Sequence, residues 1–154
     1  MSSHLQAELQ QHKPFSCLEQ EAHLSIARTA AVLDHAMAEA LRPHDLTPTQ
    51  YNALRILRGA GEQGLCRNSV RDRLIARVPD ATRLLDRLED MGHVTRVREG
   101  EDRRFVRANI TRAGLDLLRR LDAEVIASHH RLLGHLGVRK LKALIELLAE
   151  ARGG

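Results

Sequence analysis

The chain has 154 residues with a formal net charge of +4, and 29% of its residues are charged and 43% hydrophobic. A chain of this length builds one hydrophobic core, which excludes a large multidomain enzyme, and the composition is that of a globular protein. Aromatic residues make up only 2%, which argues against binding of single-stranded nucleic acid by base stacking.

The sequence has no apolar leader and no run of about 18 apolar residues, so we expect a cytoplasmic protein that does not bind membranes. Its two cysteines, Cys17 and Cys66, form no C-x-x-C pair, which fits a reducing compartment. We expect each to be a small buried or half-exposed thiol, with a redox role as the alternative.

The first two helices are predicted by periodicity and by a start signal. Apolar residues recur at three- and four-residue steps from Leu18 to Leu41, which predicts an amphipathic helix of about six turns. A second helix begins with Thr47 at the cap, Pro48 at the first position and Gln50 three residues after the threonine. A third, shorter helix is expected after Asn68, with its apolar positions extending to residue 75.

A fourth helix is predicted to begin with Pro79 at its first position and Asp80 beside it, and to end near Met91. Its apolar face and the valine before it are expected in the core: Val78, Ala81, Leu84, Leu85 and Leu88. Segments 94–98 and 105–110 then predict a β-hairpin with a charged tip.

Thr111 is expected to cap a last long helix, which glycines at 134 and 137 separate from a final amphipathic segment at 141–148. A helix, a tight turn, a second helix and a hairpin within a short stretch are typical of a winged helix-turn-helix. The predicted fold class is therefore mainly α with a small β-hairpin wing.

We expect one intertwined domain with three regions: a dimerisation helix at 1–45, the winged helix-turn-helix at 46–114 and dimerisation helices at 115–154. The long first and last helices carry apolar faces that the central module covers only in part, so we expect a homodimer. Packing of the same faces within one chain is the alternative.

Arginine is concentrated in the winged segment. Between residues 67 and 107 there are eleven arginines, no lysine and eight acidic residues. Arginine binds phosphates and guanine edges through two parallel hydrogen bonds, so we expect double-stranded DNA as the partner. The alternative for each arginine is a solvated side chain or a helix ion pair, such as Asp86 and Asp90 with Arg83 and Arg87.

The expected DNA contacts fall into two groups. Those in the recognition helix are Pro79, Asp80, Thr82 and Arg83 on the bases and Arg87 on phosphate. Those in the wing are Arg96, Arg98, Arg103 and Arg104 on the minor groove or phosphates, with Asp102 orienting an arginine.

Four segments resemble the multiple antibiotic resistance regulator (MarR) family of bacterial transcription factors. They are Leu46–Tyr51, Asp80–Gly92, Asp102–Arg104 and Ile110–Gly114, and they match in order and spacing. The resemblance covers about residues 20 to 150. It implies a triangular homodimer with intertwined terminal helices and a wing motif formed by Asp102 and Arg104. Two-fold symmetry predicts a pseudo-palindromic operator, and repression is the family's commoner mode of action.

The resemblance also implies a small anionic or phenolic effector, with Arg28, His35, His44 and Tyr51 as candidate pocket residues. Within the same family, Cys17 is a candidate redox sensor, and nine histidines raise metal sensing as an alternative. Their spacing gives no three- or four-ligand metal site, so we expect no metal and no cofactor.

Motifs for catalysis are absent from the sequence: it has no glycine-rich phosphate loop, no H-E-x-x-H and no G-x-S-x-G. We therefore expect a protein that is not an enzyme. The alternative from another class is a winged-helix module that binds proteins and not DNA.

Overall fold

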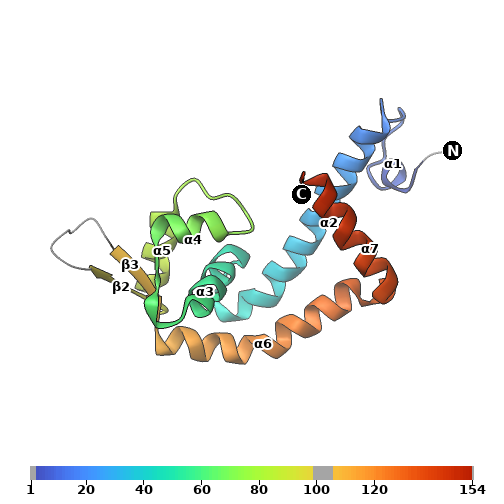
Figure 1. Ribbon diagram of the computed structural model, residues 1–154. Coiled ribbons are helices and arrows are strands. Elements are labelled where there is room, and N and C mark those ends of the chain that lie inside the picture. Colours follow the sequence, from blue (N-terminus) through green and yellow to red (C-terminus); the bar gives the residue numbers. More distant parts are fainter. Residues whose placement is uncertain (1–2, 99–105, 154) are drawn as a thin grey trace. The chain divides into compact units, whose positions relative to one another are not determined.

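The structure, a computed structural model, describes residues 3–98 and 106–153 (Figure 1). By its internal contacts the chain divides into two compact units, Met1–Met37 and Ala38–Gly154. Among the described residues, no helix is both long enough and apolar enough to cross a membrane.

The first unit consists of a short helix α1 (His4–Glu8) and most of α2 (Leu18–Leu41). The bounds predicted for α2 are confirmed. Helix α1 was not predicted, because its single turn carries no apolar period; it is held by the Ser3 side chain, which accepts from the Gln6 N–H at 3.2 Å. Large apolar side chains of α2 remain exposed, among them Leu18 at 82%.

The second unit holds five α-helices in the described residues, with short 3-10 turns between some of them. The α-helices are α3 (Pro48–Ala60), α4 (Arg67–Arg73), α5 (Ala81–Asp90), α6 (Arg112–Leu133) and α7 (Gly137–Ala151). The turns are η1 (Arg42–His44), η2 (Gly61–Gln63) and η3 (Gly134–Leu136).

An antiparallel sheet accompanies these helices, with its strands in the order β1 (Leu65–Cys66), β3 (Val106–Ile110), β2 (Val94–Arg98). The predicted hairpin is confirmed by the β2–β3 pairing, in which Val94 lies opposite Ile110. Strand β1 was not predicted. It has only two residues, and its pairing with β3 joins parts of the chain about forty residues apart.

Local signals explain where α3 and α6 begin. The Gln50 N–H donates to Thr47 Oγ1 at 3.2 Å, and the Thr47 N–H donates to Gln50 Oε1 at 3.0 Å, which completes the predicted capping box. Thr111 caps α6 by accepting from the Gly114 N–H at 3.1 Å, also as predicted.

Two predicted helix bounds need correction. The Asp80 side chain accepts from the Arg83 N–H at 3.0 Å, so Asp80 is the cap of α5 and Pro79 lies before the helix, not at its first position. Helix α4 ends at Arg73, because Leu74 adopts an extended backbone with ψ of 140°. Ile75 is therefore 90% exposed, not part of an apolar helix face.

The core of the second unit lies where α3 packs against α4, α6 and β3, and where α5 packs against α4 and β2. Leu54, Leu57 and Leu118 have no exposed surface there. Of the side chains expected in the core around α5, Ala81, Leu85 and Leu88 are buried. Leu84 of α5 is only half-buried, and so is Val78, which lies in the segment before this helix.

Gly114 explains how closely α6 approaches the base of the wing. A Cβ at this position would lie 2.6 Å from the His93 carbonyl oxygen and 2.7 Å from Ile110 Cγ1. The Thr111 hydroxyl donates to the Gly92 carbonyl at 2.7 Å at the same junction. The start of α6, the end of α5 and the start of β2 therefore meet at one tightly packed point.

Candidate nucleic-acid interface

Helix α5 presents two arginines to solvent, Arg83 in its first turn and Arg87 in its last turn. Arg83 and Arg87 are exposed, and neither forms an ion pair with any residue in 3–98 or 106–153. The alternative in which Asp86 pairs with them is not observed, since Asp86 binds Arg96 instead. Both guanidinium groups are thus available to an anionic partner.

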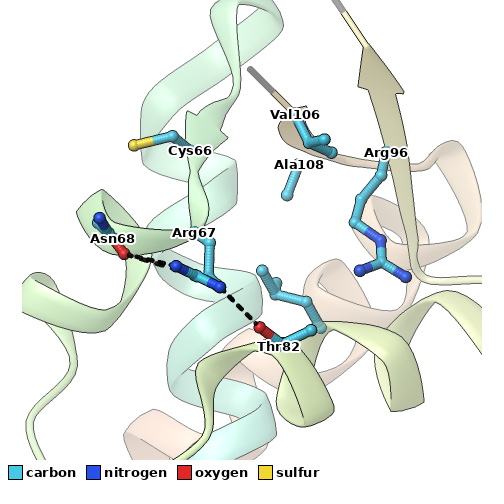
Figure 2. A pocket seen from close by; sticks show the side chains of 8 residues that line it. Cys66, Arg67, Asn68, Thr82, Arg96, Val106 and Ala108 are labelled. Carbon is cyan, nitrogen blue, oxygen red and sulfur yellow. Dashed lines mark hydrogen bonds between the residues drawn. The ribbon is translucent and has the colours of Figure 1, made fainter. Parts of the chain in front are cut away.

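The remaining residues predicted for the recognition helix lie close to these arginines in sequence. Pro79 and Asp80 are exposed, and Asp80 acts as the helix cap. Thr82 is half-buried, and its Oγ1 accepts from Arg67 Nη1 at 3.2 Å (Figure 2). Arg67 was not singled out by sequence analysis, although it belongs to the arginine-rich segment; its position at the first turn of α4 is the feature that brings it to α5.

In the wing, the structure describes only the strands. Arg98 is exposed at the end of β2, opposite Val106. Arg107 on β3 donates from Nη1 to the Gln63 carbonyl at 3.2 Å. The residues predicted at the wing tip, Asp102, Arg103 and Arg104, lie outside the described residues.

Arg96 has different neighbours from those expected of a DNA contact. Its Nη2 lies 2.5 Å from Asp86 Oδ1 and 2.6 Å from Glu89 Oε2, and the side chain is 27% exposed. Hydrogen bonds from Arg96 lower the pKa of the Glu89 carboxyl, and those same bonds raise the pKa of Arg96. The guanidinium is therefore engaged with carboxylates of α5.

A pocket of about 340 Å³ lies between α4, α5 and the strands (Figure 2). Its lining combines polar and apolar side chains: Cys66, Arg67, Asn68, Thr82, Leu85, Arg96, Val106 and Ala108. The Cys66 Sγ lies 3.2 Å from Ser69 Oγ. That hydrogen bond lowers the pKa of the thiol, with smaller contributions from nearby backbone N–H groups and from the charge of Arg107.

Both cysteines are exposed, so the expectation of buried or half-exposed thiols is wrong. The physical reason is their placement: Cys17 directly precedes α2, and Cys66 occupies a strand of two residues that leads into α4. Cys17 lines a second pocket, of about 280 Å³, together with Phe15 and residues of the first unit.

The four residues predicted for an effector pocket have separate environments. In the first unit, Arg28 Nε lies 4.0 Å from Glu8 Oε2, and His35 is exposed. In the second unit, His44 Nε2 lies 3.1 Å from Glu124 Oε2. Tyr51 is buried, with the Arg55 guanidinium carbon 5.9 Å from its ring centroid.

None of these four residues lines either of the two pockets described above. In the part of the chain that the structure describes, no group of three or more metal-ligating side chains is placed to hold an ion.

The chain is similar to solved transcription regulators. It is 41% identical to a MarR transcription factor from Planctomyces limnophilus, with a TM-score of 0.69 over 88% of this chain and 98% of that one. A mutant MarR from E. coli complexed with operator DNA is 26% identical, with a TM-score of 0.77 over 88% and 99% of the two chains. The MepR–DNA complex of S. aureus, at 18% identity, has a TM-score of 0.77 over 85% and 96%, which shows the shared fold. No family model and no curated protein sequence matches the chain.

Proposed function

Because this chain belongs to the MarR family of transcription regulators, which are not enzymes, we propose that it binds double-stranded DNA sequence-specifically through α5 and the wing. One observation carries the proposal: Arg83 and Arg87 stand exposed on α5 and make no ion pair with the described residues. Such arginines supply the hydrogen-bond donors and the positive charge that a duplex requires.

The proposed roles follow from the surroundings of each residue. Arg83, with Thr82 and Pro79 beside it, contacts base edges in the major groove, and Arg87 binds phosphate. Asp80 sets the start of the helix, because its carboxylate accepts from the Arg83 N–H. In the wing, Arg98, Arg103 and Arg104 contact the minor groove or its phosphates, and Asp102 orients Arg104.

We further propose that the regulator acts as a homodimer on a pseudo-palindromic operator. Exposed apolar side chains on α2 and on α7, Val32 and Ile145 among them, support pairing with a second copy. We propose, on the basis of the family to which the chain belongs, that the bound homodimer represses transcription. A small anionic or phenolic effector would release it from DNA.

The proposal is tested by selecting duplexes from a random pool and titrating the selected site at several salt concentrations. Arg83→Ala should weaken binding to this site by about ten-fold or more and relax the sequence preference, because a contact to a base edge contributes about 1–3 kcal/mol. Arg139→Ala, which removes an exposed arginine from α7, is the control for loss of one positive charge.

Three results would contradict the proposal: no binding to duplex DNA, equal binding to all duplexes, or an Arg83→Ala variant that keeps its affinity and preference. If the chain did not bind duplex DNA but bound a protein through the exposed surface of α5, the protein-binding alternative would be favoured.

A further inference from the structure

Helix α5 and strand β2 are joined by more than the short connection between them. Arg96 of β2 reaches two carboxylates of α5, Asp86 and Glu89; we name these three residues the helix–wing clamp. The Arg96 Nε–H donates to Glu89 Oε2 at 3.0 Å, in addition to the two short Nη2 contacts given above. Figure 2 shows the Arg96 side chain extending from its strand toward the helix that carries Thr82.

The backbone of β2 takes part in the same clamp. The Arg96 main-chain N–H donates to Glu89 Oε1 at 3.2 Å, so the two oxygens of one carboxylate hold the main chain and the side chain of one strand residue. Bonds between charged groups in this arrangement are stronger and more directional than neutral ones. The position of β2 against α5 is thereby fixed at a defined residue.

The clamp carboxylates and the exposed arginines lie on different faces of α5. At 100° per residue, Thr82, Asp86 and Glu89 lie within about 60° of one another around α5, whereas Arg83 and Arg87 are centred about 110° farther around the helix. Arg67 binds Thr82 near the start of this face, and Arg96 binds Asp86 and Glu89 farther along it. Two arginines from α4 and β2 thus hold one side of α5 while the other side is left open.

We propose that Arg96 is a positioning residue for sequence recognition: by holding Asp86 and Glu89, it fixes the geometry in which α5 and the wing together meet one DNA half-site. This inference rests on the proposed function. Contacts to base edges require their side chains to be placed within about 0.5 Å, whereas attraction to phosphates tolerates looser placement. The clamp therefore acts on the preference for the specific site more than on binding to DNA in general.

The test compares Arg96→Gln with wild type on the selected duplex and on an unrelated duplex of the same length. We expect the ratio of specific to non-specific affinity to fall about ten-fold or more, because misplacement by about 1 Å is enough for losses of that order. Affinity for the unrelated duplex should stay within about two-fold of wild type, and Arg96→Lys, which keeps a charge near Glu89, should recover part of the ratio.

Arg58→Gln is the matched control. Arg58 donates from Nη1 and Nη2 to Asp122 at 2.9 and 3.0 Å, its side chain is 28% exposed, and it joins α3 to α6 away from the clamp. The same chemical change therefore breaks an ion pair of similar exposure. All variants are compared at a temperature where circular dichroism shows them folded, and the ratio should be unchanged in Arg58→Gln.

The outcomes separate the clamp from the proposed function. If wild type shows no preference among duplexes, the proposed function fails. If wild type has the preference but Arg96→Gln and Arg58→Gln change the ratio equally, the clamp has no positioning role. If Arg96→Gln weakens specific and non-specific binding by the same factor, Arg96 contacts DNA directly and the inference is overturned.

Discussion

The winged region and the terminal helices contain the same kinds of apolar residues but differ in what covers them. In α3, Leu54 and Leu57 have no exposed surface. In α7, by contrast, Val138 and Ile145, which are seven residues apart and share one face, are 71% and 65% exposed. The first region therefore completes its core within one chain, whereas the second leaves an apolar face that one copy does not bury.

Helix α2 of the first unit, like α7, leaves large apolar side chains exposed. Leu18 and Ile26, which belong to the periodic apolar face of α2, are 82% and 46% exposed, although the helix has the length of a well-formed amphipathic element. The comparison teaches that periodicity identifies an apolar face without identifying the chain that covers it. It also predicts that the effect of a mutation depends on protein concentration in the terminal helices but not in the winged region.

The largest expected effect is in the winged core. Leu54→Ala should lower the free energy of unfolding by about 2–5 kcal/mol, because the side chain is fully buried and its loss leaves a cavity. Urea titration measures this loss, which should be the same at low and high protein concentration. Ile75→Ala, at a 90% exposed position in the same unit, should change stability by less than about 0.5 kcal/mol.

An intermediate effect is expected on α7. Ile145→Glu should raise the dimer dissociation constant about ten-fold or more, equivalent to about 1.4 kcal/mol, because a charge would enter the proposed interface. Sedimentation equilibrium measures it. Lys140→Gln makes the same one-unit change in charge at an exposed position on the opposite side of this helix and should leave the dimer intact. A wild-type chain that is monomeric throughout, or an unchanged constant in Ile145→Glu, would remove α7 from the interface.

The smallest expected effect concerns pH at the junction of α5, β2 and α6. His93 Nδ1 is buried without a hydrogen-bond partner among the described residues, and burial, aided by the charge of Arg120, lowers the pKa of the imidazole. Below about pH 6.5 the unfolded chain therefore binds more protons than the folded one, and stability falls as pH decreases from there through the folded pKa.

Urea midpoints at about pH 7.5 and about pH 5.5 test this dependence. His93→Gln should flatten the decrease toward acid pH, whereas His130→Gln, at an exposed histidine of α6, should retain it. An unaltered decrease in His93→Gln would show that other groups produce it.

The elements that sequence analysis placed well are those specified by neighbours in the chain. The Thr47 capping box, the cap at Thr111 and the period of α2 each depend on residues within a few positions of one another. Such signals act before any tertiary packing is present, which is why the helices from α2 onward, the hairpin and the winged-helix arrangement could be predicted.

The sequence by itself determined that this protein is a mainly helical winged-helix chain with an arginine-rich segment between residues 67 and 107. Tertiary structure alone decided which arginines remain available: Arg83 and Arg87 stay open, while Arg96 binds Asp86 and Glu89. An arginine has the same chemistry in either role, and its partner depends on how strand and helix pack. Strand β1 also depends on tertiary packing: its two residues show no periodicity of their own and form a strand only because β3 lies beside them.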